Sequence, residues 1–229
     1  MSDSAQNVPP QAPQKSSFIG KIFGTVIASL VLSIVIEWVG MAFIWQDQGI
    51  NHSKQMMAQE FAWFSSEFQQ SLIYSKPVAF AQTSINFLHE WLFVKTGIQH
   101  WLNSPKNNAM ESWVIYYVGD YIQATFYVMI VFVIRLFIIV LTSPLFILAA
   151  LVGLIDGLVQ RDLRRFGVGR ESAYVYHHAK RLVAPVMFVA WVIYLSIPMS
   201  IHPNFILIPS AVLFGMMIAL TSSSFKKYL

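Results

Sequence analysis

Residues 113–158 form the longest apolar stretch of the chain, and no other feature constrains its fold as strongly. As one helix they would be roughly twice as long as the apolar core of a bilayer is thick. The break signal within them is Ser143-Pro144, because proline removes a backbone donor and disfavours helix before it. A tight hairpin there would place the basic residues 161–181 outside, whereas one kinked helix keeps them inside, as the positive-inside rule favours. We therefore predict one crossing at about 117–141 that continues past Pro144 along the inner interface, with two crossings as the alternative.

The composition is that of a membrane protein. The chain is 56% hydrophobic and 11% charged, whereas an average soluble domain has about 25% charged residues. A soluble core cannot enclose so many apolar side chains, so the surplus is expected to face lipid or partner helices. We predict an all-α, polytopic membrane protein with about four transmembrane helices: helix 1 within residues 18–45, helix 2 within 113–160, and helices 3 and 4 as a hairpin within 183–222.

Both ends of the chain are predicted to be cytoplasmic. Residues 1–17 are polar and rich in Pro, Gln and Ser, which is typical of a disordered tail. Residues 223–229 form a short second tail that contains Lys226 and Lys227. The chain has no cysteine, which excludes disulfides and cysteine-based metal or catalytic sites.

Residues 46–112 are predicted to form a periplasmic helical region. Phe61, Phe64 and Phe68 follow helical spacing on one face, with Gln, Ser and Glu on the other, and a second helix follows Pro77. This pair of helices would lie on or above the outer membrane surface, either as a cap packed over the spans or as a docking surface for another subunit. The aromatic residues that would form such a docking surface are Phe61, Phe64, Trp91 and Trp101.

Four ionisable residues lie in or near the predicted spans. A charge at membrane depth is unfavourable unless it faces protein or water, so such residues usually pair or line a path. Glu37 and Arg135 are expected to pair across helices 1 and 2 if helix tilt brings their depths together. The alternative is a proton or ion path. The four residues are Glu37, Asp120, Arg135 and Asp156.

Residues 161–182 are predicted to form a basic helical hairpin on the cytoplasmic side. Gly167 and Gly169 provide its turn, because glycine adopts positive φ without a Cβ clash. Three interpretations are open: an anchor on anionic lipid, a docking site for a cytoplasmic protein, and, least favoured, contact with nucleic acid phosphates. The candidate interaction residues are Arg161, Arg164, Arg165, Arg170, Tyr174, His177, His178, Lys180 and Arg181.

No catalytic or metal-binding motif is visible in the sequence. His177 and His178 are adjacent, so on a helix they point about 100° apart, and no third ligand is evident. The sequence contains no P-loop, HExxH motif or evident Ser-His-Asp set. We therefore expect neither enzyme activity nor a cofactor.

The segment RDLRRFGVGRESAYVYHHAKR, residues 161–181, resembles the signature of an uncharacterised family of membrane proteins from integrating conjugative elements. Members of that family are typically encoded beside the type IV coupling protein, the ATPase that delivers DNA to the conjugative secretion channel. The resemblance implies an inner-membrane accessory of conjugative DNA transfer, with coupling-protein or other type IV secretion subunits as partners and homo-oligomers as a further possibility. A small transporter or channel that uses Glu37, Asp120 and Arg135 is the alternative.

Overall fold

The computed structural model describes residues 18–225, except residues 70, 72, 74, 104–108 and 167–172. The predicted tails and the turn glycines Gly167 and Gly169 therefore lie outside the described residues. The described part contains helices and no strand, which confirms the predicted all-α class. The helices are α1 (Phe18–Phe43), α2 (Ile50–Glu67), α3 (Pro77–His89), the π-helix η1 (Glu90–Lys95), α4 (Ile98–Asn103), α5 (Ala109–Leu141), α6 (Ser143–Phe166), α7 (Ala173–Ser196) and α8 (Asn204–Ser223).

Four helical stretches in the described part are long and apolar enough to cross a membrane, as predicted. They are Ile19–Phe43, Tyr117–Arg164, Tyr176–Ser196 and Asn204–Ser223. This set is compatible with a multi-pass membrane protein. The second stretch has 48 residues and would measure about 72 Å as a helix, against a bilayer core of about 30 Å. A single crossing of that stretch stays a prediction.

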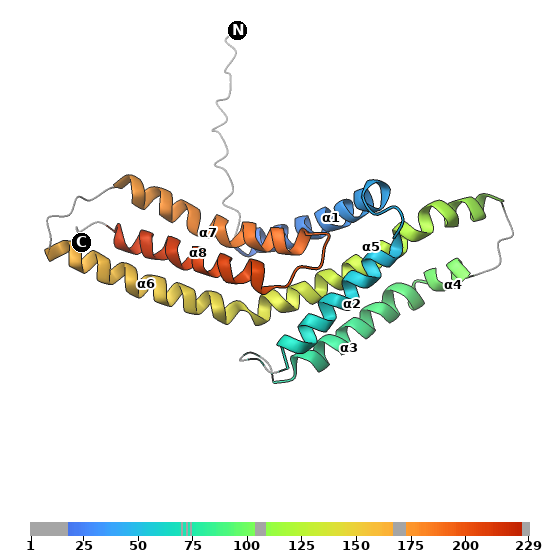
Figure 1. Cartoon of the computed structure of the whole chain (residues 1–229), viewed down its shortest axis with the longest axis horizontal. Helices are drawn as coiled ribbons and strands as arrows, with labels where there is room; N and C mark the ends of the chain where they lie inside the picture. Colours follow the sequence, from blue (N-terminus) through green and yellow to red (C-terminus); the bar gives the residue numbers. More distant parts are fainter. Residues whose placement is uncertain are drawn as a thin grey trace, which may run out of the picture.

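Helices α5 and α6 form one long bent rod (Figure 1). Thr142 alone separates them, and its hydroxyl donates a hydrogen bond to the carbonyl of Ile138 at 2.7 Å. Pro144 is the second residue of α6, where a proline is tolerated because first-turn N–H groups have no partner within the helix. The chain bends at this point, and α6 leads away from α5 without folding back along it.

The other long helices are arranged in two halves along this rod (Figure 1). In one half α8 lies between α6 and α7, and in the other α1, α2 and α3 lie beside α5. α1 also reaches α7, where the Ser196 hydroxyl donates to the carbonyl of Ser29 at 3.3 Å. One buried apolar cluster joins the halves, since it contains Ile134 of α5 together with Leu207 of α8.

The contact between α6 and α8 depends on small residues. A Cβ atom added to Gly157 would lie 2.5 Å from the carbonyl oxygen of Ala219, and one added to Gly153 would collide with the carbonyl of Gly215. Gly153 faces Gly215, and Gly157, four residues later on α6, faces Ala219, four residues later on α8. The two helices therefore run in the same direction. Glycine spaced in this way lets helix backbones approach closely, as in small-xxx-small packing of membrane helices.

One predicted boundary differs in the structure. The second arm of the predicted basic hairpin and the span predicted from residue 183 are one helix, α7, which runs without interruption from Ala173 to Ser196. α2, the first helix of the predicted periplasmic region, packs along α5. The cause is a buried stripe on α2 that includes Ser53 and Glu60, which sequence pattern had placed on the polar face.

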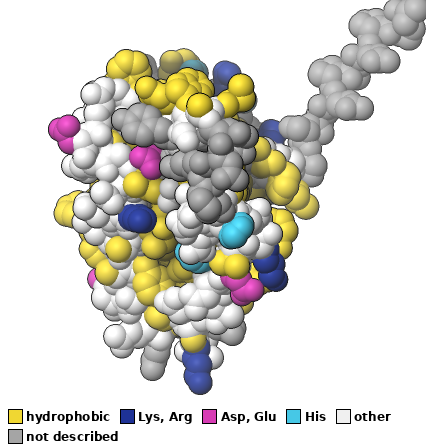
Figure 2. All heavy atoms as spheres, turned by 90° about the vertical axis from the view of Figure 1, so that its right-hand side faces the viewer, with side chains coloured by type: hydrophobic (Ala, Val, Ile, Leu, Met, Phe, Trp, Pro, Cys, Tyr) yellow, Lys and Arg dark blue, Asp and Glu magenta, His cyan; other side chains and the backbone are white. Residues whose placement is uncertain are grey.

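Large apolar side chains remain exposed on the outer faces of the long helices. Val31 of α1, Ile155 of α6 and Val212 of α8 are examples. These outer faces suit contact with lipid. Figure 2 looks onto one end of the molecule, where charged and histidine side chains lie among apolar ones.

Candidate functional site

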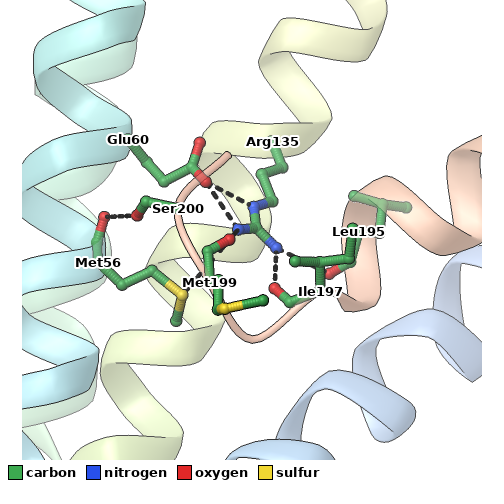
Figure 3. A network of polar contacts seen from close by, with 7 residues as sticks. All are labelled: Met56, Glu60, Arg135, Leu195, Ile197, Met199 and Ser200. Carbon is green, nitrogen blue, oxygen red and sulfur yellow. Dashed lines mark hydrogen bonds and ion pairs between the residues drawn. The ribbon is translucent and has the colours of Figure 1, made fainter. Parts of the chain in front are cut away.

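Arg135, in the apolar helix α5, is the centre of a buried polar network (Figure 3). Its side chain is 1% exposed, and that of Glu60 on α2 is 0% exposed. Nε and Nη2 of Arg135 donate to one oxygen, Oε1 of Glu60, at 3.0 and 2.7 Å. An isolated charge in a dry interior is strongly unfavourable. Glu60 is therefore the counter-charge that lets α5 bury Arg135.

The remaining N–H groups of Arg135 hold the end of α7. Nη1 donates to the carbonyl of Ile197 at 2.6 Å and to that of Leu195 at 3.5 Å. Nη2 donates to the carbonyl of Met199 at 2.9 Å. A guanidinium has five N–H groups, so each of them has an acceptor here. The carbonyls at a helix C-terminus carry partial negative charge, which makes a cation favourable at this position.

The turn between α7 and α8 also rests on α2. The Ser200 hydroxyl donates to the carbonyl of Met56 at 3.3 Å, as Figure 3 shows. His202 Nε2 lies 3.6 Å from Oε1 of Glu67, and its ring lies 5.6 Å from that of Trp63. The network thus connects α2 and α5 of one half to α7 and α8 of the other.

Two buried polar atoms beside Arg135 have no hydrogen-bond partner in the described part of the chain: Oε2 of Glu60 and the hydroxyl of Tyr194. The Arg135 guanidinium lies 5.5 Å from the centre of the Tyr194 ring, a cation–π distance. Burial raises the pKa of Glu60, and the nearby guanidinium opposes that rise. With all donors of Arg135 occupied, the arrangement is that of a brace between helices.

The predicted pairing of Glu37 with Arg135 is wrong. Glu37 is 1% exposed, and its Oε1 accepts from the Ser53 hydroxyl at 2.7 Å and lies 3.0 Å from His52 Nδ1. The ring of His52 stacks on Trp45 with centroids 4.1 Å apart. Both buried charges of the apolar helices therefore find their partners on α2. Ser53 and Glu60 are seven residues apart and thus share a helical face, but this spacing does not show that α2 buries that face.

The other two charges predicted in the spans are exposed. Asp156 accepts a hydrogen bond from Gln160 Nε2 at 2.8 Å, one turn further along α6. Asp120 lines a cleft between α2, α4 and α5. Among the described residues, no contact joins Glu37, Asp120 and Arg135 into one connected set. An ion path through them stays a prediction.

The predicted cytoplasmic interaction residues that the structure describes lie on the last turns of α6 and the first turns of α7. These turns lie at the same end of the molecule, where Tyr176 of α7 contacts Phe225, just beyond α8, with ring centroids 5.6 Å apart. Lys180 and Arg181 are exposed, and Arg161 and Arg164 are half-buried. The side chain of Arg165 and all of Arg170 lie outside what the structure describes.

Aromatic side chains at this end, which we call the basic end, are arranged in two i, i+4 pairs. The ring of Tyr174 lies 4.0 Å from that of His178, and His178 Nδ1 lies 2.9 Å from the carbonyl of Tyr174. Tyr176 contacts Lys180 in a cation–π arrangement at 5.7 Å. His177 contacts Tyr176 instead of joining Tyr174 and His178. His177 and His178 thus lie on different sides of α7, because adjacent helical residues diverge.

The predicted periplasmic docking residues have different environments. Phe64 is buried in the core, so it cannot form part of an exposed surface, and Phe61 packs against the same core. Trp91 is exposed, and Trp101 is half-buried. Within the described ranges, no group of three or more His, Asp or Glu side chains converges as a metal site.

Comparison with known proteins gives a family but no relative of established structure. No curated protein and no solved structure matches the chain significantly. One family model matches residues 44–226, which include every described helix from α2 to α8. This match includes α2, the Arg135 network and the basic end. The chain therefore belongs to the DtrJ-like family, described as IncC plasmid conjugative DNA transfer proteins DtrJ-like.

Proposed function

We propose that the protein is a non-enzymatic inner-membrane subunit of a conjugative type IV secretion apparatus. Its membership of a conjugative DNA transfer family supports a role in transfer. Its four apolar helical stretches support a position in the membrane. Within that apparatus the partner would be the coupling ATPase or a channel component.

The observation that carries the proposal is the basic end. The end of α6 and the start of α7, which carry the cationic residues of the segment 161–181, lie at the same end of the molecule. Positive charge beside membrane spans favours the cytoplasmic side, which is where a coupling ATPase has its catalytic domains. Positive charge alone would suit anionic lipid as well as a protein partner. The basic end also carries exposed aromatic side chains, since Phe166 is 93% exposed and Tyr174 is 72% exposed. Exposed aromatic groups among cations are typical of protein interfaces.

The buried network supplies the rigidity that such a docking end needs. Arg135 ties α5 and α2 to the end of α7, and α7 extends from there to the basic end. The orientation of the basic end relative to the rest of the chain thus depends on contacts far from it. In this proposal α2, α3 and η1 lie on the periplasmic side of the molecule, and both termini lie in the cytoplasm.

Co-purification from donor cells tests the proposal. The tagged full-length chain, extracted in mild detergent, is expected to bring down a coupling or channel subunit, identified by mass spectrometry. Deletion of the gene is expected to lower transfer frequency, and the intact gene in trans to restore it. If no transfer subunit is recovered and deletion leaves transfer unchanged, the proposal is wrong.

A further inference from the structure

A polar cleft of about 380 Å³ lies between α2, the start of η1, α4 and α5. Such a volume is in the range of small-molecule sites. Part of its wall comes from His89 and Phe93, where the helix widens into the π-helical segment Glu90–Lys95. Short π-helical segments are frequent beside functional sites. The cleft is separate from the Arg135 network and from the basic end.

Two opposite charges line this cleft without meeting. Lys54 and Asp120 both face it, yet they form no ion pair with each other in the described part of the chain. Nζ of Lys54 instead lies 5.7 Å from the centre of the Tyr127 ring. An ammonium and a carboxylate that share a cleft but stay apart can each receive one end of a ligand with two opposite charges.

Further hydrogen-bonding capacity surrounds these charges. The side-chain amides of Gln99, Asn103 and Gln123 line the cleft, and none has a hydrogen-bond partner among the described residues. Each amide offers two N–H donors and one acceptor oxygen. Lys54, Gln99, Asn103 and Asp120 are exposed to solvent, so a ligand in the cleft would replace water at these groups.

The cleft lies at an end of the molecule that is rich in tryptophan and tyrosine. Trp38 of α1 donates from Nε1 to the Thr125 hydroxyl at 3.0 Å and packs edge-on against Tyr121. Trp113 and Tyr117 contact each other at 5.0 Å and are 61% and 54% exposed. Figure 2, which faces this end, shows histidine, basic and acidic side chains among the apolar ones. Tryptophan and tyrosine of this kind mark the level of lipid headgroups.

We propose that this cleft binds the headgroup of a zwitterionic phospholipid of the phosphatidylethanolamine type. The phosphate accepts hydrogen bonds from Lys54 and the amides, and the ammonium group donates to the carboxylate of Asp120. An anionic headgroup such as phosphatidylglycerol offers no cation to Asp120 and places negative charge near it. A zwitterion satisfies both unpaired charges at once.

Native mass spectrometry of the full-length chain in detergent tests the proposal. The probes are short-chain phosphatidylethanolamine, short-chain phosphatidylglycerol and water-soluble glycerophosphoethanolamine. The wild type is expected to retain phosphatidylethanolamine in preference to the other two. Lys54→Gln and Asp120→Asn are each expected to weaken its binding by about tenfold, the effect of losing one charge-assisted hydrogen bond.

Lys95→Gln and Asp47→Asn are the matched controls, because both residues are exposed and neither lines the cleft. They are expected to retain phosphatidylethanolamine as the wild type does. Circular dichroism and gel filtration confirm that each variant is folded. Equal binding of both lipids by the wild type, or unchanged binding by both cleft variants, would overturn the proposal. Binding of glycerophosphoethanolamine as tight as that of the lipid would overturn the membrane as the source of the ligand.

Discussion

Nη2 of Arg135 lies 2.7 Å from Oε1 of Glu60, and neither side chain is more than 1% exposed. The pair joins α5 to α2, and the other N–H groups of Arg135 extend the connection to the carbonyls at the end of α7. A buried ion pair adds little net stability compared with apolar residues of the same shape, but removing one partner strands the other. The pair therefore specifies how the two halves of the molecule fit together.

The first prediction concerns the removal of one partner. Glu60→Leu leaves Arg135 buried without a counter-charge, so the free energy of unfolding should fall by about 3–5 kcal/mol. The double variant Glu60→Leu with Arg135→Met removes both charges and should recover part of that loss, because the carbonyls of Ile197 and Met199 then lose their donor. Thermal unfolding of the purified chain in detergent, followed by circular dichroism, measures both effects.

The control for this pair is Glu90→Gln, since Glu90 is an exposed residue whose contact with Lys95 is 3.9 Å long. An exposed pair contributes about 0–1 kcal/mol, so this variant should unfold close to the wild type. If Glu60→Leu is as stable as Glu90→Gln, or if the double variant is the least stable of all, Arg135 and Glu60 do not act as a buried pair.

Sequence pattern predicted the fold class and the candidate spans because long apolar runs have few alternatives in a membrane protein. The same reasoning placed Arg135 in a dry helix that needs a counter-charge. Glu37 was the predicted partner because it lies in another predicted span. The actual partner, Glu60, lies on α2. The spacing of the apolar residues of that helix had placed Glu60 on the polar face.

The sequence does not show which helix faces pack against each other, because each such contact depends on two elements. Glu60 follows Met56 and precedes Phe64 by four residues each, so all three share the buried face of α2. Which of two neighbouring stripes a helix buries is decided by the surface that it packs against, here α5. The α6–α8 contact is a similar case. Gly153 and Gly157 are visible in sequence, but their partners Gly215 and Ala219 follow only from the arrangement of the helices.

The second prediction tests that close packing. Gly157→Ile places a branched side chain where even a Cβ atom would lie 2.5 Å from the Ala219 carbonyl. Overpacking of this kind should lower the free energy of unfolding by about 1–3 kcal/mol or more. Gly20→Ile is the control, because nothing lies within 4 Å of a Cβ at Gly20. Thermal melts in detergent that give the same midpoint for both variants would contradict the α6–α8 contact.

The third prediction concerns orientation in the membrane. The chain contains no cysteine, so single cysteines at two exposed positions, Lys95→Cys and Lys180→Cys, report one site each. In the proposed orientation a membrane-impermeant maleimide labels position 95 from the periplasm. It labels position 180 only after the inner membrane is opened. Labelling of both positions in intact spheroplasts would contradict the proposed orientation and move the basic end to the periplasmic side.

The fourth prediction concerns the basic end and rests on the proposed docking role. Replacing Lys180 and Arg181 by Glu reverses two exposed charges without touching the buried core, so the chain should still fold and insert. Loss of about 1.4 kcal/mol of docking free energy corresponds to tenfold weaker binding, and transfer frequency in mating assays should fall by about that factor.

Lys95→Glu reverses an exposed charge on η1 and serves as the matched control. Immunoblots of the membrane fraction verify that both variants are present at the wild-type level, and the tagged variants are tested for co-purification. A docking role requires that the reversal at residues 180 and 181 lowers both transfer and recovery of the partner, while Lys95→Glu lowers neither. If transfer falls but the partner is still recovered in full, the basic end acts on lipid or on DNA passage instead of on that partner.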